Sequence, residues 1–303
     1  MKAIDPFVLA KIQDLPLKAK LIAEGVLSGT HRSRHLGVSV EYADHKDYSP
    51  GDDLRFIDWR AYARRDKFLI KRFEEDTAIR GYLVLDQSGS MSYKGSFRVG
   101  SKKNKSGSIF SKLDYAKLLA ASLAYLILHQ KDAVALAVMK DGLSQYLPPR
   151  SHWNHFHHLI TSMEESRGEG KGNLAEGLQS LSLKLNRRGL FLIFSDLFED
   201  FDALLNCLRK LRSRRHDVVL FHVLDRWEID FPFYESTQFI DLESKDRMVV
   251  QAKSIRDRYL EEMQNFLKKV RAECLQEHVD YHLAVTDEPP DQILTKFLIQ
   301  RKR

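Results

Sequence analysis

Five short apolar segments constrain the fold of this chain of 303 residues more than any other feature. Each is a nearly continuous apolar run, and together they are 79–86, 132–139, 189–196, 217–225 and 279–285. Helix-like stretches separate them, at 112–130, 152–166, 173–186, 201–215 and 252–277. Continuous apolar strands that alternate with helices are typical of a mostly parallel sheet with helices on both faces. The pattern therefore predicts an α/β, doubly wound fold.

The remaining segments add to this sheet. Residues 144–149 predict a short antiparallel edge strand, because Pro148 and Pro149 end it. Residues 7–27 have the apolar spacing of a helix, interrupted at Pro16. We therefore expect two parts. Residues 1–78 form an N-terminal helix and a small strand-containing lobe packed on the main domain, and residues 79–303 form the sheet domain.

Composition excludes several classes of protein. The chain is 43% hydrophobic and 30% charged, as in an ordinary soluble globular protein. No apolar run approaches the roughly 18 residues of a membrane span, and the N-terminus lacks the apolar core of a signal peptide. We expect a cytoplasmic protein with no membrane span. Cys207 and Cys274 show neither a disulfide framework nor metal-ligand spacing, so we expect buried, reduced thiols.

The net charge of +6 comes from local basic stretches. Residues 94–112 and 209–215 contain no acidic residue. Neither stretch convincingly combines its basic residues with aromatic residues or with a nucleic-acid-binding motif, so nucleic-acid binding is disfavoured. We interpret the first stretch, which ends at Lys112, as a solvated loop and the second as a solvated helix end.

Oxygen-bearing side chains follow two of the predicted strands. Asp86, Ser88 and Ser90 alternate directly after the first strand, and Asp196 ends the strand at 189–196. A glycine-rich loop, "GEGKGNLAEGL", lies between them in sequence and opens a helix. Ligands of doubly wound sheets bind at the carboxyl ends of the strands, so we expect the three loops to meet in one crevice.

These oxygens suit a hard divalent cation, Mg²⁺ or Mn²⁺. Asp86 and Asp196 would supply two negative charges, and the serine hydroxyls would add ligands without charge. The ion would stay electrophilic and attract a carboxylate from outside the protein. The pattern therefore favours an adhesion site over a hydrolytic one, with no catalytic residue assigned.

The stretch "DQSGSM" resembles the D-x-S-x-S metal-ion-dependent adhesion site of von Willebrand factor A domains. The segment "EYADHKDYSPGDDLRFIDWRAYARRDKFLIKRFEED", followed by "LVLDQSGSM", resembles the bacterial domain-of-unknown-function-58 (DUF58) family. The resemblance covers residues 28–225. It implies that Asp86, Ser88, Ser90 and Asp196 are metal ligands, and that Asn173 stands where the second loop usually carries Thr.

The resemblance also marks a signature block upstream of the sheet domain. Its members are Gly51, Asp52, Arg55, Asp58, Trp59 and Arg64. We expect Arg55 and Arg64 to form ion pairs with Asp52, Asp58 or Glu74 that clamp the N-terminal lobe to the sheet. A docking surface for a partner is the alternative, because Trp and Arg are frequent interface hot spots.

The resemblance implies a partner as well. Members of the family resemble partners of MoxR-type AAA+ ATPases, so we expect a non-enzymatic binding module that assists the maturation or assembly of client proteins. Two alternatives stay open. A metal-dependent hydrolase could use the same crevice, although the three loops contain no His to act as a base. A nucleic-acid-binding protein could use the basic loops.

Overall fold

The structure is a computed structural model that describes residues 5–30, 45–47, 69–71, 79–95, 110–185 and 187–301. The chain divides into two compact units, one formed by residues 1–34 with 80–303 and the other by residues 35–79. The boundary at 79/80 lies next to the predicted division, and the N-terminal helices group with the sheet rather than with residues 35–79.

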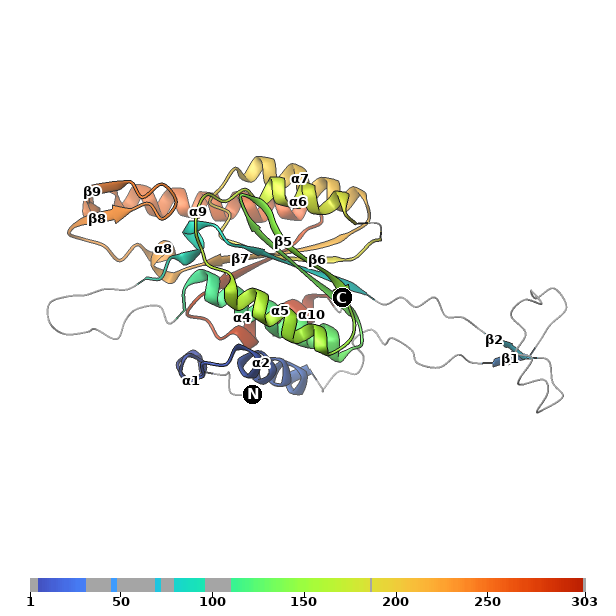
Figure 1. Cartoon of the computed structure of the whole chain (residues 1–303). Helices are drawn as coiled ribbons and strands as arrows, with labels where there is room; N and C mark the ends of the chain where they lie inside the picture. The colour runs from blue at the N-terminus through green and yellow to red at the C-terminus, as the bar shows by residue number, and fades with distance from the viewer. Residues whose placement is uncertain are drawn as a thin grey trace. The chain divides into compact units, whose positions relative to one another are not determined.

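The larger unit is built around a six-stranded sheet with the order β10-β7-β6-β3-β4-β5 (Figure 1). Its strands are β3 (Arg80–Asp86), β4 (Ala133–Lys140), β5 (Gly142–Arg150), β6 (Leu190–Ser195), β7 (Asp217–Leu224) and β10 (Asp280–Val285). Five strands run parallel, and β5 pairs antiparallel with β4 at one edge. The predicted mostly parallel α/β sheet is confirmed, including its antiparallel edge strand.

Helices cover both faces of this sheet (Figure 1). One face carries α6 (Leu174–Leu183), α7 (Phe201–Ser213) and α9 (Ala252–Gln276), and the other carries α2 (Leu15–Thr30), α4 (Lys112–His129), α5 (Asn154–Glu165) and α10 (Pro290–Arg301). The short helix α1 (Pro6–Lys11) precedes α2. Pro16 lies in the first turn of α2, where a proline is tolerated. The predicted interruption of the helix therefore falls between the end of α1 at Lys11 and the start of α2 at Leu15.

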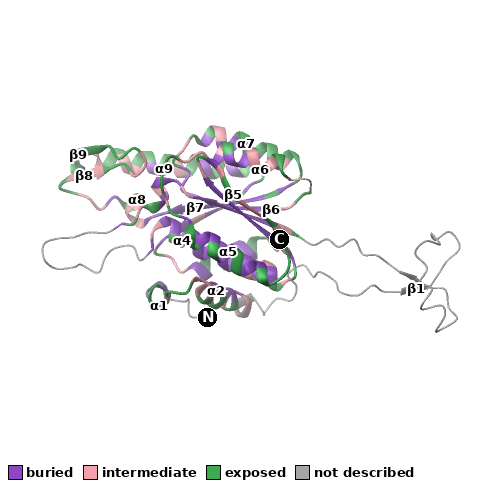
Figure 2. Ribbon diagram, viewed as in Figure 1, coloured by how far each residue is buried: buried purple, intermediate pink, exposed green. Residues whose placement is uncertain are grey.

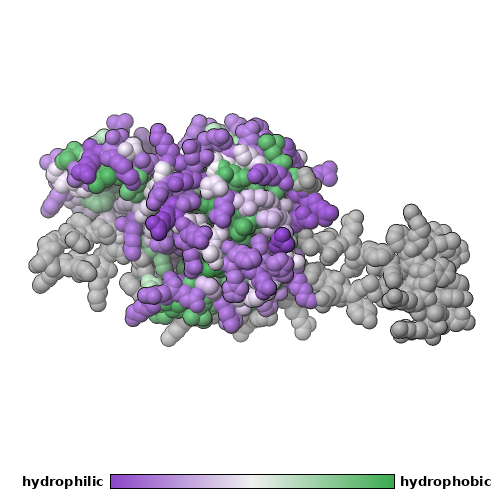
Figure 3. All heavy atoms as spheres, in the orientation of Figure 1, coloured by the Kyte–Doolittle hydropathy of each residue, from purple (hydrophilic) through white to green (hydrophobic). Residues whose placement is uncertain are grey.

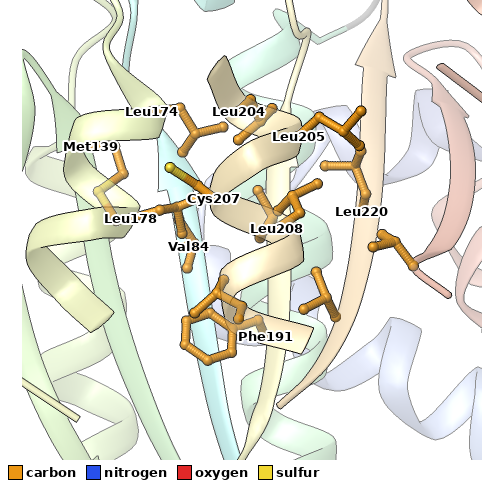
Figure 4. Close-up of a cluster of buried hydrophobic side chains, with 14 of the residues drawn as sticks. Val84, Met139, Leu174, Leu178, Phe191, Leu204, Leu205, Cys207, Leu208 and Leu220 are labelled. Carbon is orange, nitrogen blue, oxygen red and sulfur yellow. The ribbon is translucent and has the colours of Figure 1, made fainter. Parts of the chain in front are cut away.

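The core lies between the strands and these helices. The central strands are buried on both faces, which explains why their sequences are continuously apolar (Figure 2). On one side, Val84, Phe191 and Leu220 of the sheet pack with Leu178 of α6 and Leu208 of α7 (Figure 4). Cys207 belongs to the same cluster and Cys274 is also buried, as predicted for structural thiols.

An antiparallel hairpin stands apart from the main sheet. Strand β8 (Ser236–Ile240) pairs with β9 (Arg247–Gln251), and the hairpin follows the short helix α8 (Arg226–Asp230). Strand β8 alternates exposed and partly buried residues, and β9 is exposed at four of its five positions. Neither strand has the burial on both faces that produced the apolar runs of the other strands. The sequence analysis did not predict this hairpin.

The smaller unit is described only at two short strands. Strand β1 (His45–Asp47) pairs antiparallel with β2 (Leu69–Lys71), which agrees with a strand-containing lobe. The signature residues Gly51, Asp52, Arg55, Asp58, Trp59 and Arg64, with Glu74, lie outside the described residues, and so do positions 96–108 of the basic loop. None of the helices in the described part of the chain combines the length and the apolar character that a membrane span requires.

Candidate metal centre

The first loop leaves β3 at Asp86, which is buried with 3% of its surface exposed. The main-chain N–H of Ser88 donates to Asp86 Oδ1 over 2.8 Å, which folds the loop back on the carboxylate. The loop continues into the short 3-10 helix η2 (Gly89–Ser92). The hydroxyl oxygens of Ser88 and Ser90 lie 3.0 Å apart. Alternation along a tight turn has therefore placed three polar side chains on one side of the loop.

The second loop is joined to the first by main-chain hydrogen bonds. The N–H of Gly89 donates to the carbonyl of Gly170 (2.9 Å), and the N–H of Glu169 donates to the carbonyl of Gln87 (3.1 Å). A Cβ atom on Gly172 would lie 2.9 Å from Cβ of Ser88, so this position needs glycine for the close approach.

The third loop follows β6 and brings Ser195 and Asp196 to the first loop. The Ser195 hydroxyl donates to Asp86 Oδ2 over 2.6 Å, and it accepts the N–H of Leu197 over 3.0 Å. The Ser90 hydroxyl hydrogen bonds to Asp196. Leu197 has a φ of 60°, in the left-handed region that costs a non-glycine residue on the order of 1 kcal/mol. The predicted convergence of Asp86, Ser88, Ser90 and Asp196 is therefore present.

The sequence analysis missed Lys112 as a member of this centre and placed it in a solvated loop, which is wrong. Its side chain is fully buried, and Nζ donates to Asp196 Oδ2 (2.7 Å) and to Glu228 Oε1 (2.6 Å). The ammonium also lies 4.6 Å from the centre of the Phe198 ring. Both carboxylates are distant in sequence, so local charge pattern could not identify them. A lysine that opens a helix apolar on all sides was the available signal.

The two buried aspartates are held in opposite charge environments. Burial and, after it, the negative charge of Asp196 raise the pKa of Asp86 to about 6, against the hydrogen bonds from Ser195 and Ser88 that lower it. Burial also opposes ionisation of Asp196, but the attraction of Lys112 outweighs it and lowers the pKa of Asp196. Asp196 is thus a stable carboxylate, whereas none of the described residues places a positive charge in contact with Asp86.

Asn173 lies beside the centre, but its side chain makes other contacts. It caps helix α6, because its Oδ1 accepts the N–H of Glu176 (3.1 Å) and its Nδ2 donates to Glu176 Oε2 (2.7 Å). Its main-chain N–H donates to the carbonyl of Lys140. In this arrangement the amide oxygen is used by the helix, so a role of Asn173 as a ligand stays a prediction.

Two further carboxylates border the centre and were not predicted. Glu199 accepts the N–H of Leu174 with both oxygens, and burial followed by the charge of Asp86 raises its pKa to about 7. Glu243 comes from the turn of the β8–β9 hairpin, and its Cγ would lie 3.1 Å from a Cβ atom on Gly89 of the first loop. The hairpin had no strand signal, so its arrival at the crevice could not be predicted.

The side chains that converge fit a hard cation in their chemistry. Carboxylate oxygens of Asp86 and Asp196 and hydroxyl oxygens of Ser88 and Ser90 are the oxygen ligands that Mg²⁺ and Mn²⁺ prefer. They are linked through hydrogen bonds, and the charge of Asp86 is left without a positive neighbour in direct contact. Asn173 does not contribute its side chain to this set.

Substitution of Ser195 tests whether the network supports Asp86. We expect Ser195→Ala to lower the free energy of unfolding by about 1–3 kcal/mol, because a buried carboxylate loses a hydroxyl donor and the Leu197 N–H loses its acceptor. Urea denaturation measures this. The matched control is Ser122→Ala, because Ser122 is equally buried but donates only to a carbonyl of its own helix. Equal losses in the two variants would contradict the assignment.

A mostly parallel, doubly wound sheet with an Asp-x-Ser-x-Ser loop after a central strand and an Asp at the end of the neighbouring strand defines the von Willebrand factor A-like class of α/β proteins. Residues 44–268 match the family described as "Protein of unknown function DUF58", and this chain belongs to that family.

The relatives and structural neighbours are as follows. The uncharacterized protein Rv1480 of Mycobacterium tuberculosis is 27% identical over 245 residues, which cover 79% of this chain and 72% of the relative. The uncharacterized protein Mb1516 of Mycobacterium bovis matches to the same extent. BatB, a conserved hypothetical protein from Bacteroides thetaiotaomicron, shares 12% identity at a TM-score of 0.47, covering 74% of this chain and 98% of that chain. The SpRpn10 VWA domain shares 11% identity at a TM-score of 0.39, covering 72% and 94%.

Proposed function

We propose that this chain is a non-enzymatic, metal-dependent protein-binding module, in which a divalent cation at the crevice captures an acidic side chain of a partner. The observation that carries the proposal is the convergence of Asp86, Ser88, Ser90 and Asp196 from two loops into one hydrogen-bonded group. The ion would be Mg²⁺ or Mn²⁺, since both accept hydroxyl and carboxylate oxygens.

The charge balance supports a cation. Lys112 forms ion pairs with Asp196 and Glu228. Burial and then the charge of Asp196 raise the pKa of Asp86, and burial and then the charge of Asp86 raise the pKa of Glu199. A divalent cation would relieve this repulsion and hold Asp86 as a carboxylate at neutral pH. Two carboxylates and two hydroxyls would supply four of the roughly six oxygen ligands that Mg²⁺ takes, so coordination positions would stay open. A carboxylate of a partner protein would fill one of them.

The partner class is proposed from the family resemblance. The Asp-x-Ser-x-Ser loop and the upstream signature block resemble proteins that act with MoxR-type AAA+ ATPases in the maturation or assembly of other proteins. We propose such an ATPase as the partner. A hydrolase using the same crevice is a weaker proposal, because the three loops contain no histidine and His222 contacts only the main-chain carbonyl of Asp196 among the site residues.

The proposal is tested with Asp86→Asn, which keeps the shape of the side chain and removes its charge. We expect the variant to bind Mn²⁺ at least about 100-fold more weakly by calorimetry, since a charged ligand is lost. It should also fail to retain a MoxR-type ATPase in a pull-down, and wild type should lose the ATPase in EDTA. The control is Asp280→Asn, an exposed residue at the start of β10. Retention of the ATPase by Asp86→Asn, or by wild type in EDTA, would refute the proposal.

A further inference from the structure

We infer that the turn of the β8–β9 hairpin is an internal ligand of the crevice. The Glu243 carboxylate occupies the position that a partner's acidic side chain would take, so the turn must leave before a partner binds. That Glu243 takes the place of a ligand rests on the proposed function. That the turn covers the first loop does not depend on the proposed function.

The turn lies directly against the first loop. A Cβ atom on Gly89 would lie 2.7 Å from the carbonyl oxygen of Leu242 and 3.1 Å from Cγ of Glu243. Gly89 stands between the two serines of the Asp-x-Ser-x-Ser loop, so the hairpin turn covers the main chain at the centre of the predicted ligand set. The absence of a side chain at this position is what permits the approach.

Glu243 lies where the first two loops meet. Burial raises the pKa of the Glu243 carboxyl, and the charge of Asp196 raises it further, whereas the main-chain N–H groups of Ser90 in the first loop and Gly172 in the second lower it. The carboxylate therefore lies close enough to both loops to interact with their N–H groups and with Asp196. A carboxylate of a partner that entered the crevice would meet the same groups.

The turn presents Glu243 in a fixed conformation. Asp241 Oδ1 accepts the N–H of Glu243 (2.7 Å) and of Ser244 (3.1 Å), and the N–H of Asp241 donates to the carbonyl of Asp246. Lys245 adopts a φ of 65° to close the turn. Local hydrogen bonds of this kind preform a turn before it makes any long-range contact. The hairpin thus presents Glu243 on a preformed turn, as a loop of a partner protein would present its acidic side chain.

The hairpin is anchored near its turn by aromatic side chains. Phe239 of β8 pairs with Met248, one residue pair away from the pair that borders the turn. Phe239 stacks with Phe231 and contacts Phe233 edge to face, and Phe231 packs on Tyr259 of α9. Met248 itself is exposed, and apolar side chains appear on this part of the surface (Figure 3). The turn and this aromatic anchor would therefore move together when the turn leaves the crevice.

Hydrogen exchange of the full-length protein in EDTA tests the cover without any metal. In Glu243→Ala we expect the amides of Ser90 and Gly172 to exchange about fivefold faster or more than in wild type, because the turn that covers them loses its contact with the two loops. The matched control is Glu235→Ala, an exposed glutamate just before β8 that should leave these amides unchanged. Equal exchange in wild type and Glu243→Ala would overturn the inference.

Water-proton relaxation with Mn²⁺ alone tests the ligand position. The ion in Glu243→Ala should hold one more exchangeable water than in wild type, seen as higher relaxivity per bound ion. Equal relaxivity would overturn the assignment of Glu243 to the partner's position. Absence of Mn²⁺ binding to wild type and to Glu243→Ala would instead refute the proposed function, and the exchange experiment would still decide whether the turn covers the crevice.

Discussion

Lys112→Met is expected to destabilise the protein by about 3–5 kcal/mol in EDTA. Methionine keeps most of the volume but removes the ammonium, which contacts Asp196 at 2.7 Å and Glu228 at 2.6 Å. The two carboxylates then remain at a buried position without their cation, and this is the costly way to break a buried ion pair. Urea denaturation with and without Mg²⁺ measures the loss. If the proposed site binds the ion, Mg²⁺ should restore part of it by supplying positive charge beside Asp196.

Lys117→Met is the matched control, five positions along the same helix. Lys117 is also buried, but its Nζ donates to the main-chain carbonyl of Ser166 (2.6 Å), and burial lowers its pKa. Its replacement removes one hydrogen bond to a neutral acceptor, so we expect a loss of about 1–2 kcal/mol with no response to Mg²⁺. Similar losses and similar Mg²⁺ responses in both variants would show that Lys112 does not act through the carboxylates.

Asp86→Asn is expected to change the pH dependence of stability by about 3 kcal/mol in EDTA. Burial raises the pKa of Asp86 from 3.8 to about 6. The folded protein then binds this proton more tightly than the unfolded chain, so the free energy of unfolding falls as the pH rises between those values. The difference between wild type and Asp86→Asn isolates this group from other titrating residues, which include His222. As the pH rises from about 4 to about 7, the stability of wild type should fall relative to that of Asp86→Asn.

Asp196→Asn gives the opposite sign and is the internal control. Lys112 lowers the pKa of Asp196, so its contribution to stability is present at neutral pH and is lost as the pH falls through the folded pKa. Urea denaturation of the three proteins from neutral pH to well below 3.8, the ordinary pKa of an aspartate, gives both differences. Parallel pH trends for the two variants would contradict the assignment of opposite charge environments.

The strands could be predicted because a strand that is buried on both faces has a continuously apolar sequence. The segment 79–86 predicts β3 within a residue of its observed bounds, and the two prolines of 144–149 predict an edge strand that is observed in β5. The order of the strands and the faces covered by each helix depend on contacts between distant segments. The periodicity of a single segment does not encode the strand order or the covering helices. The sequence therefore predicted only the class of fold and the edge of the sheet that carries the site.

The candidate site was predictable where its residues follow strand ends. Asp86, Ser88, Ser90 and Asp196 were found in this way, because parallel strands bring their carboxyl ends to one edge. Lys112 and Glu243 reach the same edge from a helix start and a hairpin turn. The apolar character of the helix that Lys112 opens is a weak local signal for Lys112, and nothing local distinguishes Glu243 from a surface charge. Asn173 shows a different limit, since a helix N-cap and a metal ligand use the same side-chain oxygen.

Main-chain hydrogen bonds between Gly89 and Gly170 and between Glu169 and Gln87 couple the first two loops to each other. Any shift of the Asp86 loop is therefore carried into the glycine-rich loop, which ends in the exposed Lys171 just before Gly172. A fluorescent label at a cysteine placed at 171 would respond to events at Asp86 without replacing any side chain of the predicted ligand set. Unknown partners could then be screened by an optical signal from this protein alone.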